Sequence, residues 1–105
     1  MNYDVKIGEK NNFSLIENDL HRSVLQDLAV LFGTRKGTVP MYRDFGLDMR
    51  FIDMPMEAAK TVLLAEAIEA VKKFEPRAEV ISVRYESDEE LKGTAKPIVE
   101  VMIIG

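Results

Sequence analysis

The chain has 105 residues, of which 47% are hydrophobic and 30% are charged, and its formal net charge is −4. This length and composition are typical of one globular domain, residues 1–105. Cysteine is absent, which excludes disulfides, thiolate metal sites and cysteine nucleophiles. The negative charge argues against nucleic acid as the main partner, because phosphate contacts need a strongly basic surface.

The N-terminal segment and the apolar runs also limit the class of protein. The first residues lack the basic and apolar regions of a signal peptide. The longest apolar runs, at 62–65 and 101–104, are far shorter than the roughly 20 residues that span a bilayer. We therefore expect an intracellular protein with no membrane partner.

The first predicted elements are a hairpin and a helix. Tyr3, Val5 and Ile7 alternate with polar residues, and the alternation resumes after a turn-like segment, so we expect a β-hairpin over residues 2–16. Asn18 or Asp19 is suited to cap a helix over residues 19–32, which Gly33 would close in a left-handed conformation. The apolar stripe of this helix consists of Leu20, Val24, Leu25, Leu28, Leu31 and Phe32.

The segment that follows, residues 33–48, is long for a connection between two helices. Such links usually run to roughly 2–8 residues, and longer ones are often functional or disordered. This one contains apolar residues suited to anchoring it, namely Val39, Met41, Tyr42, Phe45 and Leu47. It also carries Arg35, Lys36 and Arg43, with Arg50 just beyond. We interpret it as an ordered, cationic loop that faces a partner, although solvated loop charge remains the alternative.

A second helix is predicted to begin near residues 53–55, because proline suits a first helical turn. Its predicted apolar face consists of Met56, Leu63, Leu64, Ala67, Ile68, Val71 and Phe74, with Glu66 on the opposite face. Pro76 ends this helix. Glu75 is disfavoured at a helix C-terminus, so Arg77, a loop cation or a partner's cation should compensate it. The alternative is an exposed acid beside an arginine, which contributes almost nothing.

Two strands complete the domain. Residues 79–86 alternate, with Ile81, Val83 and Tyr85 on one side and Val80, Ser82 and Arg84 on the other. Pro97 precedes a last strand, residues 98–104, that is apolar on both faces and is therefore either central or a free edge. The residues expected to pair along it are Ile98, Val99, Val101, Met102 and Ile103. The fold class is α+β, with two main helices packed on a small, mainly antiparallel β-sheet.

The residue types and their spacing do not indicate a catalytic site or a metal site. His21 is the only histidine and is expected on the surface, so we expect no metal, cofactor or small-molecule site. A glycoside hydrolase needs two carboxyls, one with a raised pKa. Asp44 and Glu75 are the only pair worth weighing, and Arg77 would lower the pKa of Glu75. Residues 44–46 (Asp44, Phe45 and Gly46) are better explained as a turn with an anchoring aromatic.

Three motifs in this order resemble the baseplate wedge family of contractile phage tails: FGTRKGTVPM at 32–41, RDFGLD at 43–48 and FEPR at 74–77. That family includes the T-even phage wedge subunit once labelled a lysozyme, protein W of P2-like phages and the sheath-initiating baseplate subunit of type VI secretion systems. The resemblance covers residues 14–104. Thr38 and the Tyr42–Asp44 run resemble a variant found in phages and prophages of Gram-positive hosts.

The resemblance implies a structural protein of the tail baseplate, not an enzyme. It implies that Glu75, Pro76 and Arg77 bind the helical core bundle of neighbouring wedge proteins. It also implies that residues 79–86 and 97–104 offer strands to which tail sheath subunits add their own. A regulatory anti-adaptor on the same fold and, less favoured, a cell-wall hydrolase are the alternatives.

Overall fold

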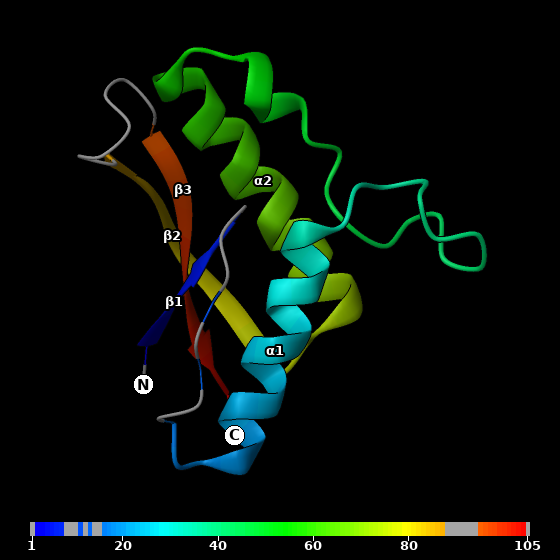
Figure 1. The fold of residues 1–105 in the computed structure, drawn as a ribbon, viewed down its shortest axis with the longest axis vertical. Coiled ribbons are helices and arrows are strands. Elements are labelled where there is room, and N and C mark those ends of the chain that lie inside the picture. Colours follow the sequence, from blue (N-terminus) through cyan, green and yellow to red (C-terminus); the bar gives the residue numbers. More distant parts are fainter. Residues whose placement is uncertain (1, 8–10, 12, 14–15, 88–94, 105) are drawn as a thin grey trace.

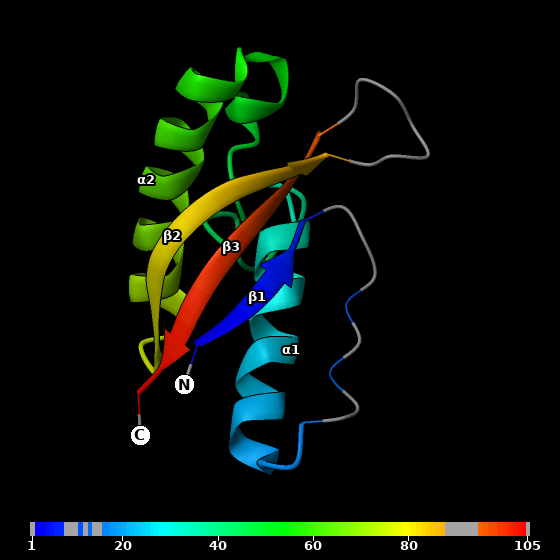
Figure 2. The ribbon, with the colours of Figure 1, turned by 90° about the vertical axis from the view of Figure 1, so that its left-hand side faces the viewer.

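The computed structural model describes residues 2–7, 11, 13, 16–87 and 95–104. The elements follow in the order β1 (Asn2–Lys6), α1 (Asp19–Gly33), the short 3-10 helix η1 (Arg50–Asp53), α2 (Met56–Phe74), β2 (Ala78–Ser87) and β3 (Ala95–Ile103). Both long helices cover the same face of a three-stranded antiparallel sheet (Figures 1 and 2). The predicted α+β class and its two helices are confirmed.

Helix α1 begins and buries its stripe largely as predicted. The Asn18 side chain accepts a hydrogen bond from the His21 N–H at 3.1 Å, which confirms it as the N-cap. The buried stripe consists of Val24, Leu25, Leu28, Leu31 and Phe32. Leu20 is 42% exposed and lies outside it. The left-handed closure at Gly33 was wrong, because Gly33 is the last residue of α1 and Thr34, in an extended conformation, caps it.

Helix α2 buries part of its predicted apolar face, Leu63, Ala67 and Val71, together with two alanines that were not predicted. Its buried residues are Ala59, Leu63, Ala67, Ala70 and Val71. Met56 and Ile68, predicted to face the core, are 46% and 45% exposed. The three buried alanines let the helix backbone lie close to its neighbours, so small side chains mark the core face here. Pro55 is the N-cap of this helix.

Strand β3 lies in the centre of the sheet, whose strand order is β1-β3-β2. Residues 2–6 of β1 pair with one edge of β3, and residues 78–87 of β2 pair with the other. Of the two alternatives, a central strand or a free edge, the structure shows the central strand. The pairing of a partner expected along Ile98, Val99, Val101, Met102 and Ile103 was therefore wrong, because β1 and β2 already occupy both edges. The two apolar faces of β3 indicate central burial, with Val99, Val101 and Ile103 in the core beneath the helices.

The predicted hairpin over residues 2–16 was wrong in its pairing. Strand β1 forms as expected, but its partner is β3, from the other end of the chain. Phe13 belongs to no strand and instead packs against the core. The remainder of the predicted second arm, residues 14–15, lies outside the described residues, as does the predicted turn at residues 8–10.

A β-bulge corrects the predicted faces of β2. Val80 pairs with Val101 and Ser82 pairs with Glu100, so Ile81 is an extra residue on β2. An extra residue reverses the alternation beyond it. Val80 consequently shares the core face with Val83 and Tyr85, whereas Ile81 is 43% exposed.

Candidate functional site

The corner formed by Glu75, Pro76 and Arg77 joins α2 to β2 and contains an ion pair between a buried carboxylate and an exposed guanidinium. Arg77 donates from Nε to Glu75 Oε1 at 2.7 Å and from Nη2 to Oε2 at 3.1 Å. The Glu75 side chain is only 7% exposed, whereas that of Arg77 is 46% exposed. Of the three predicted ways to compensate Glu75, the structure shows Arg77. Two-point contact fixes the guanidinium in one orientation at the surface.

A third charged group, Asp27 of α1, lies beside this corner. Its Oδ2 is 3.6 Å from Arg77 Nη2. Burial and the carboxylate of Glu75 raise the pKa of Asp27, while Arg77 lowers it. Two carboxylates thus share one arginine, and the cluster has an excess of negative charge. Sequence reasoning missed Asp27, because it lies about 50 residues from the corner, off the apolar stripe of its own helix.

An apolar groove of about 360 Å³ adjoins the corner between α2 and β2. Pro76, itself exposed, lies on its wall, together with Ile68 and Ile104, which are 45% and 53% exposed. Exposed isoleucines beside an oriented arginine are a combination suited to binding another protein.

The 33–50 loop, meaning residues 33–50, is ordered by backbone hydrogen bonds between its two ends. Leu47 N–H donates to the Thr34 carbonyl at 2.8 Å, and Lys36 N–H donates to the Leu47 carbonyl at 2.9 Å. Leu47 is fully buried. The loop extends beyond the helices in Figure 1. It is thus ordered, and Leu47 is an anchor, as predicted.

The other predicted anchors divide into two groups. Phe45 packs edge-to-face on Phe74, with ring centroids 5.1 Å apart, and Val39 is half-buried. Met41 and Tyr42 were wrongly predicted as anchors, since they are 86% and 65% exposed. The tip of the loop therefore presents apolar side chains to solvent.

The predicted cations of the loop remain at the surface. Arg35, Lys36 and Arg43 are exposed, and none of them has an ion-pair partner within the described ranges. The Gly37 N–H donates to the Arg43 carbonyl at 2.9 Å, which brings Arg43 close to Lys36 along the loop. Three unpaired cations in a chain of net charge −4 form a local positive patch.

Asp44 and Glu75, the pair weighed for hydrolysis, do not form a catalytic pair. Asp44 is exposed and accepts a hydrogen bond from Lys73 Nζ at 3.0 Å. Lys73 lowers the pKa of Asp44, the opposite of what a general acid needs. Arg77 occupies both carboxylate oxygens of Glu75. Gly46 supports the interpretation of residues 44–46 as a turn, because its φ is +113°.

Glu66 was predicted on the solvent face of α2 but is largely buried. Its side chain is 10% exposed, and both carboxylate oxygens lack a hydrogen-bond partner in the structure. Burial and the charge of Asp48 raise its pKa, and Arg50, 4.0 Å away, and the more remote Lys36 lower it. The sequence signal for the burial of Glu66 was the pair of small residues Ala59 and Ala70, because their spacing places position 66 in the buried stripe.

We expect Glu66→Gln to stabilise the protein at neutral pH by about 1 kcal/mol. A carboxyl whose folded pKa lies above its ordinary 4.5 binds its proton more tightly in the folded state. Its contribution to stability is therefore full below the unfolded pKa and is lost as pH rises through the folded pKa. Urea denaturation should be measured from below the unfolded pKa of Glu66 to above its folded pKa. Over this range the free energy of unfolding should fall less for the variant than for the wild type.

Glu69→Gln is the matched control, because Glu69 is exposed on the same helix. It removes the same charge and should leave the stability within about 0.5 kcal/mol of the wild type at every pH. Equal pH profiles for Glu66→Gln and the wild type would contradict the burial argument.

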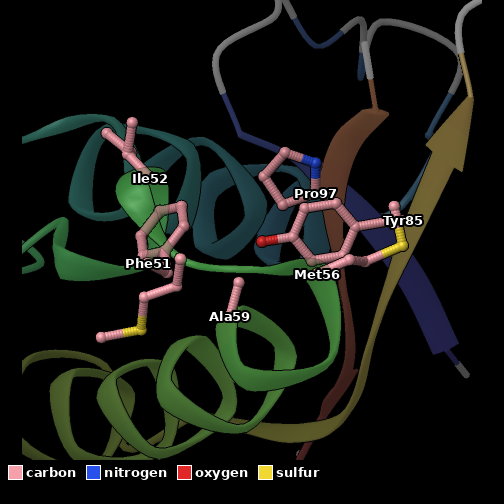
Figure 3. Close-up of a pocket in the computed structure, with 7 residues that line it drawn as sticks. Phe51, Ile52, Met56, Ala59, Tyr85 and Pro97 are labelled. Carbon is pink, nitrogen blue, oxygen red and sulfur yellow. The ribbon is translucent and has the colours of Figure 1, made fainter. Parts of the chain in front are cut away.

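A further apolar pocket of about 380 Å³ lies at the other end of α2 (Figure 3). Phe51 and Ile52 of η1 lie on one side of it, and Tyr85 of β2 and Pro97 of β3 lie on the other. Burial raises the pKa of Tyr85. Tyr85 is the one ionisable side chain among the described residues that line this pocket.

His21 is half-buried, not on the surface as predicted. Its Nδ1 lies 3.0 Å from the Tyr3 hydroxyl, and the two rings meet edge-to-face. Among the residues described, no group of three or more histidine, aspartate or glutamate side chains is placed to hold a metal ion. No helix in the described ranges is long and apolar enough to cross a membrane.

A half-buried ion pair at an oriented corner, an adjoining apolar groove and a cationic loop thus lie on the surface of a small α+β domain. Residues 18–104 match the family model described as Baseplate wedge protein gp25, and the chain belongs to that family. The resemblance carried by the three sequence motifs is confirmed. No curated protein matches the chain.

Two solved structures have a similar fold. One is in the cryo-EM structure of the anti-feeding prophage baseplate, with a TM-score of 0.66, 22% identity, and coverage of 80% of this chain and 69% of that chain. The other is in the cryo-EM structure of the pyocin R2 baseplate after contraction, with a TM-score of 0.65, 24% identity, and coverage of 79% and 84%.

Proposed function

We propose that this protein is a structural wedge subunit in the baseplate of a contractile phage tail or a phage-like injection particle. Family membership over residues 18–104 is the observation that carries the proposal. The solved chains of similar fold, from the anti-feeding prophage and pyocin R2 baseplates, support it. The role requires no catalysis. The protein would be assembled in the cytoplasm and then remain in the particle.

The corner is the proposed contact with the helical core bundle of other wedge proteins. Glu75 holds the guanidinium of Arg77 by two hydrogen bonds, so the arginine is positioned before a partner arrives. The groove beside Pro76 offers Ile68 and Ile104 to an apolar stripe of a helix. The guanidinium of Arg77 would orient the partner helix, and the groove would bury the apolar surface of that helix.

Sheath subunits are proposed to add a strand at the outer edge of β2. The edges of β3 are occupied, so residues 98–103 are excluded as the pairing strand. On the side away from β3, β2 has no neighbouring strand in the described part of the sheet. Main-chain hydrogen bonds along residues 79–86 would give affinity without demanding a particular partner sequence.

Affinity purification of the tagged protein from cells that produce tails tests both contacts. We expect wedge proteins and sheath subunits to co-purify with the wild type. Ile81→Lys places a charge on the exposed bulge of the β2 edge, which discourages strand pairing. It should lose the sheath subunits and retain the wedge proteins.

Val30→Lys is the control, since Val30 is 60% exposed on α1, away from the β2 edge. It should retain both classes of partner. Recovery of a cytosolic regulator in place of tail proteins would contradict the wedge role. Loss of sheath subunits by both variants would contradict only the assignment of the β2 edge.

A further inference from the structure

The 33–50 loop forms a small apolar pocket together with the end of α2. Val39, Tyr42, Phe45 and Phe74 line a volume of about 310 Å³. Ligand pockets range over roughly 300–1,000 Å³, so this one is at the lower limit. It has room for one large side chain and not for a cofactor.

The pocket is held open by contacts within the loop. Tyr42 N–H donates to the Val39 carbonyl at 3.1 Å, and Phe45 N–H donates to the Tyr42 carbonyl at 3.0 Å. The edge-to-face contact between Phe45 and Phe74 fixes one wall. The ion pair between Asp44 and Lys73 ties the loop to α2 beside that wall. A preformed pocket of this kind costs little ordering entropy on binding.

The surroundings of the pocket indicate the charge of its occupant. Asp44 is already neutralised by Lys73, whereas the nearby Lys36 and Arg43, with Arg35, are unpaired within the described ranges. The unpaired charge of the loop is therefore positive, although the chain as a whole is negative. A partner that carries carboxylates would be attracted to this loop in preference to the rest of the protein.

We propose that this pocket receives one large apolar side chain from an acidic segment of another baseplate protein, whose carboxylates pair with Lys36, Arg43 and Arg35. Tyr42, 65% exposed at the rim, would be covered on binding. Partly exposed tyrosines beside arginines are frequent among residues that dominate binding energy. This inference rests on the proposed function and adds the chemistry of one partner, at a pocket whose wall residue Phe74 directly precedes the corner.

The probe is a synthetic peptide with one phenylalanine flanked by three glutamates on each side. Titrated into the full-length ¹⁵N-labelled protein, this peptide should shift the backbone amide signals of residues 39, 41–45 and 74. Replacing its phenylalanine with alanine should weaken binding about tenfold, which corresponds to about 1.4 kcal/mol. Binding should also weaken as salt rises from roughly 0.05 to 0.3 M, because the charges are exposed.

Arg43→Glu should abolish binding of the glutamate peptide while the protein stays folded, because the side chain of Arg43 is exposed. Lys60→Glu is the matched control: Lys60 is 14 residues before Phe74 on α2, or about 21 Å along the helix axis. It should bind the peptide as the wild type does.

Four results would overturn the inference: no amide shifts at millimolar peptide, equal binding of a peptide with lysines in place of the glutamates, binding only to vesicles of anionic lipid, or self-association of the protein through the pocket. Each would leave the wedge role standing, because co-purification with the wild type and Ile81→Lys tests that role separately.

Discussion

Gly46→Ala is expected to destabilise the protein by about 2–4 kcal/mol. Gly46 has a φ of +113°, and a Cβ added there would lie 2.3 Å from the carbonyl oxygen of Thr34. That oxygen accepts the hydrogen bond from Leu47 that closes the 33–50 loop. Relief of the clash must break this bond and withdraw the fully buried Leu47 from the core. Urea denaturation monitored by circular dichroism measures the loss.

Gly37→Ala is the matched control for this prediction. Gly37 also has a positive φ, +90°, but nothing lies within 4 Å of an added Cβ. The Gly37→Ala variant should lose about 1 kcal/mol of unfolding free energy, because only backbone strain is added. An equal loss of stability in both variants would contradict the claim that the close contact between Gly46 and Thr34 closes the loop.

Arg77→Ala is expected to lower the melting temperature by several degrees at neutral pH. The substitution leaves the carboxylate of Glu75, 7% exposed, without the guanidinium that pairs with it and near Asp27. A buried charge that loses its partner is strongly destabilising.

The double variant Glu75→Gln/Arg77→Gln is the control that separates folding from docking. It removes both charges together and keeps polar side chains that can hydrogen-bond to each other. Thermal denaturation at neutral and acid pH should place it near the wild type and well above Arg77→Ala at neutral pH. Equal melting temperatures for the single and double variants would contradict a role for Arg77 in neutralising Glu75.

Local signals in the sequence predicted much of the fold. The apolar stripe and Asn18 predicted α1, Pro76 predicted the end of α2, and the misplaced charge of Glu75 predicted its pairing. These features depend on residues a few positions apart. The three ordered motifs predicted the family for the same reason, since each is a short local pattern with a fixed place in the chain.

Features that depend on distant residues were missed. Nothing near β3 indicates that β1, about 95 residues earlier, occupies its edge. A bulge opposite β3 reversed the faces expected for Val80 and Ile81. Asp27 meets Arg77 only when α1 packs beside the corner. Each is decided by tertiary packing, which the periodicity of one segment does not contain.

We propose that the corner docks this protein into a baseplate. The most direct test is quantitative mass spectrometry of purified tail particles from cells whose only copy is the double variant Glu75→Gln/Arg77→Gln. We predict that the folded variant is present in those cells and absent from the particles. Particles that contain the variant in the same ratio to the other baseplate proteins as the wild type would contradict the claim.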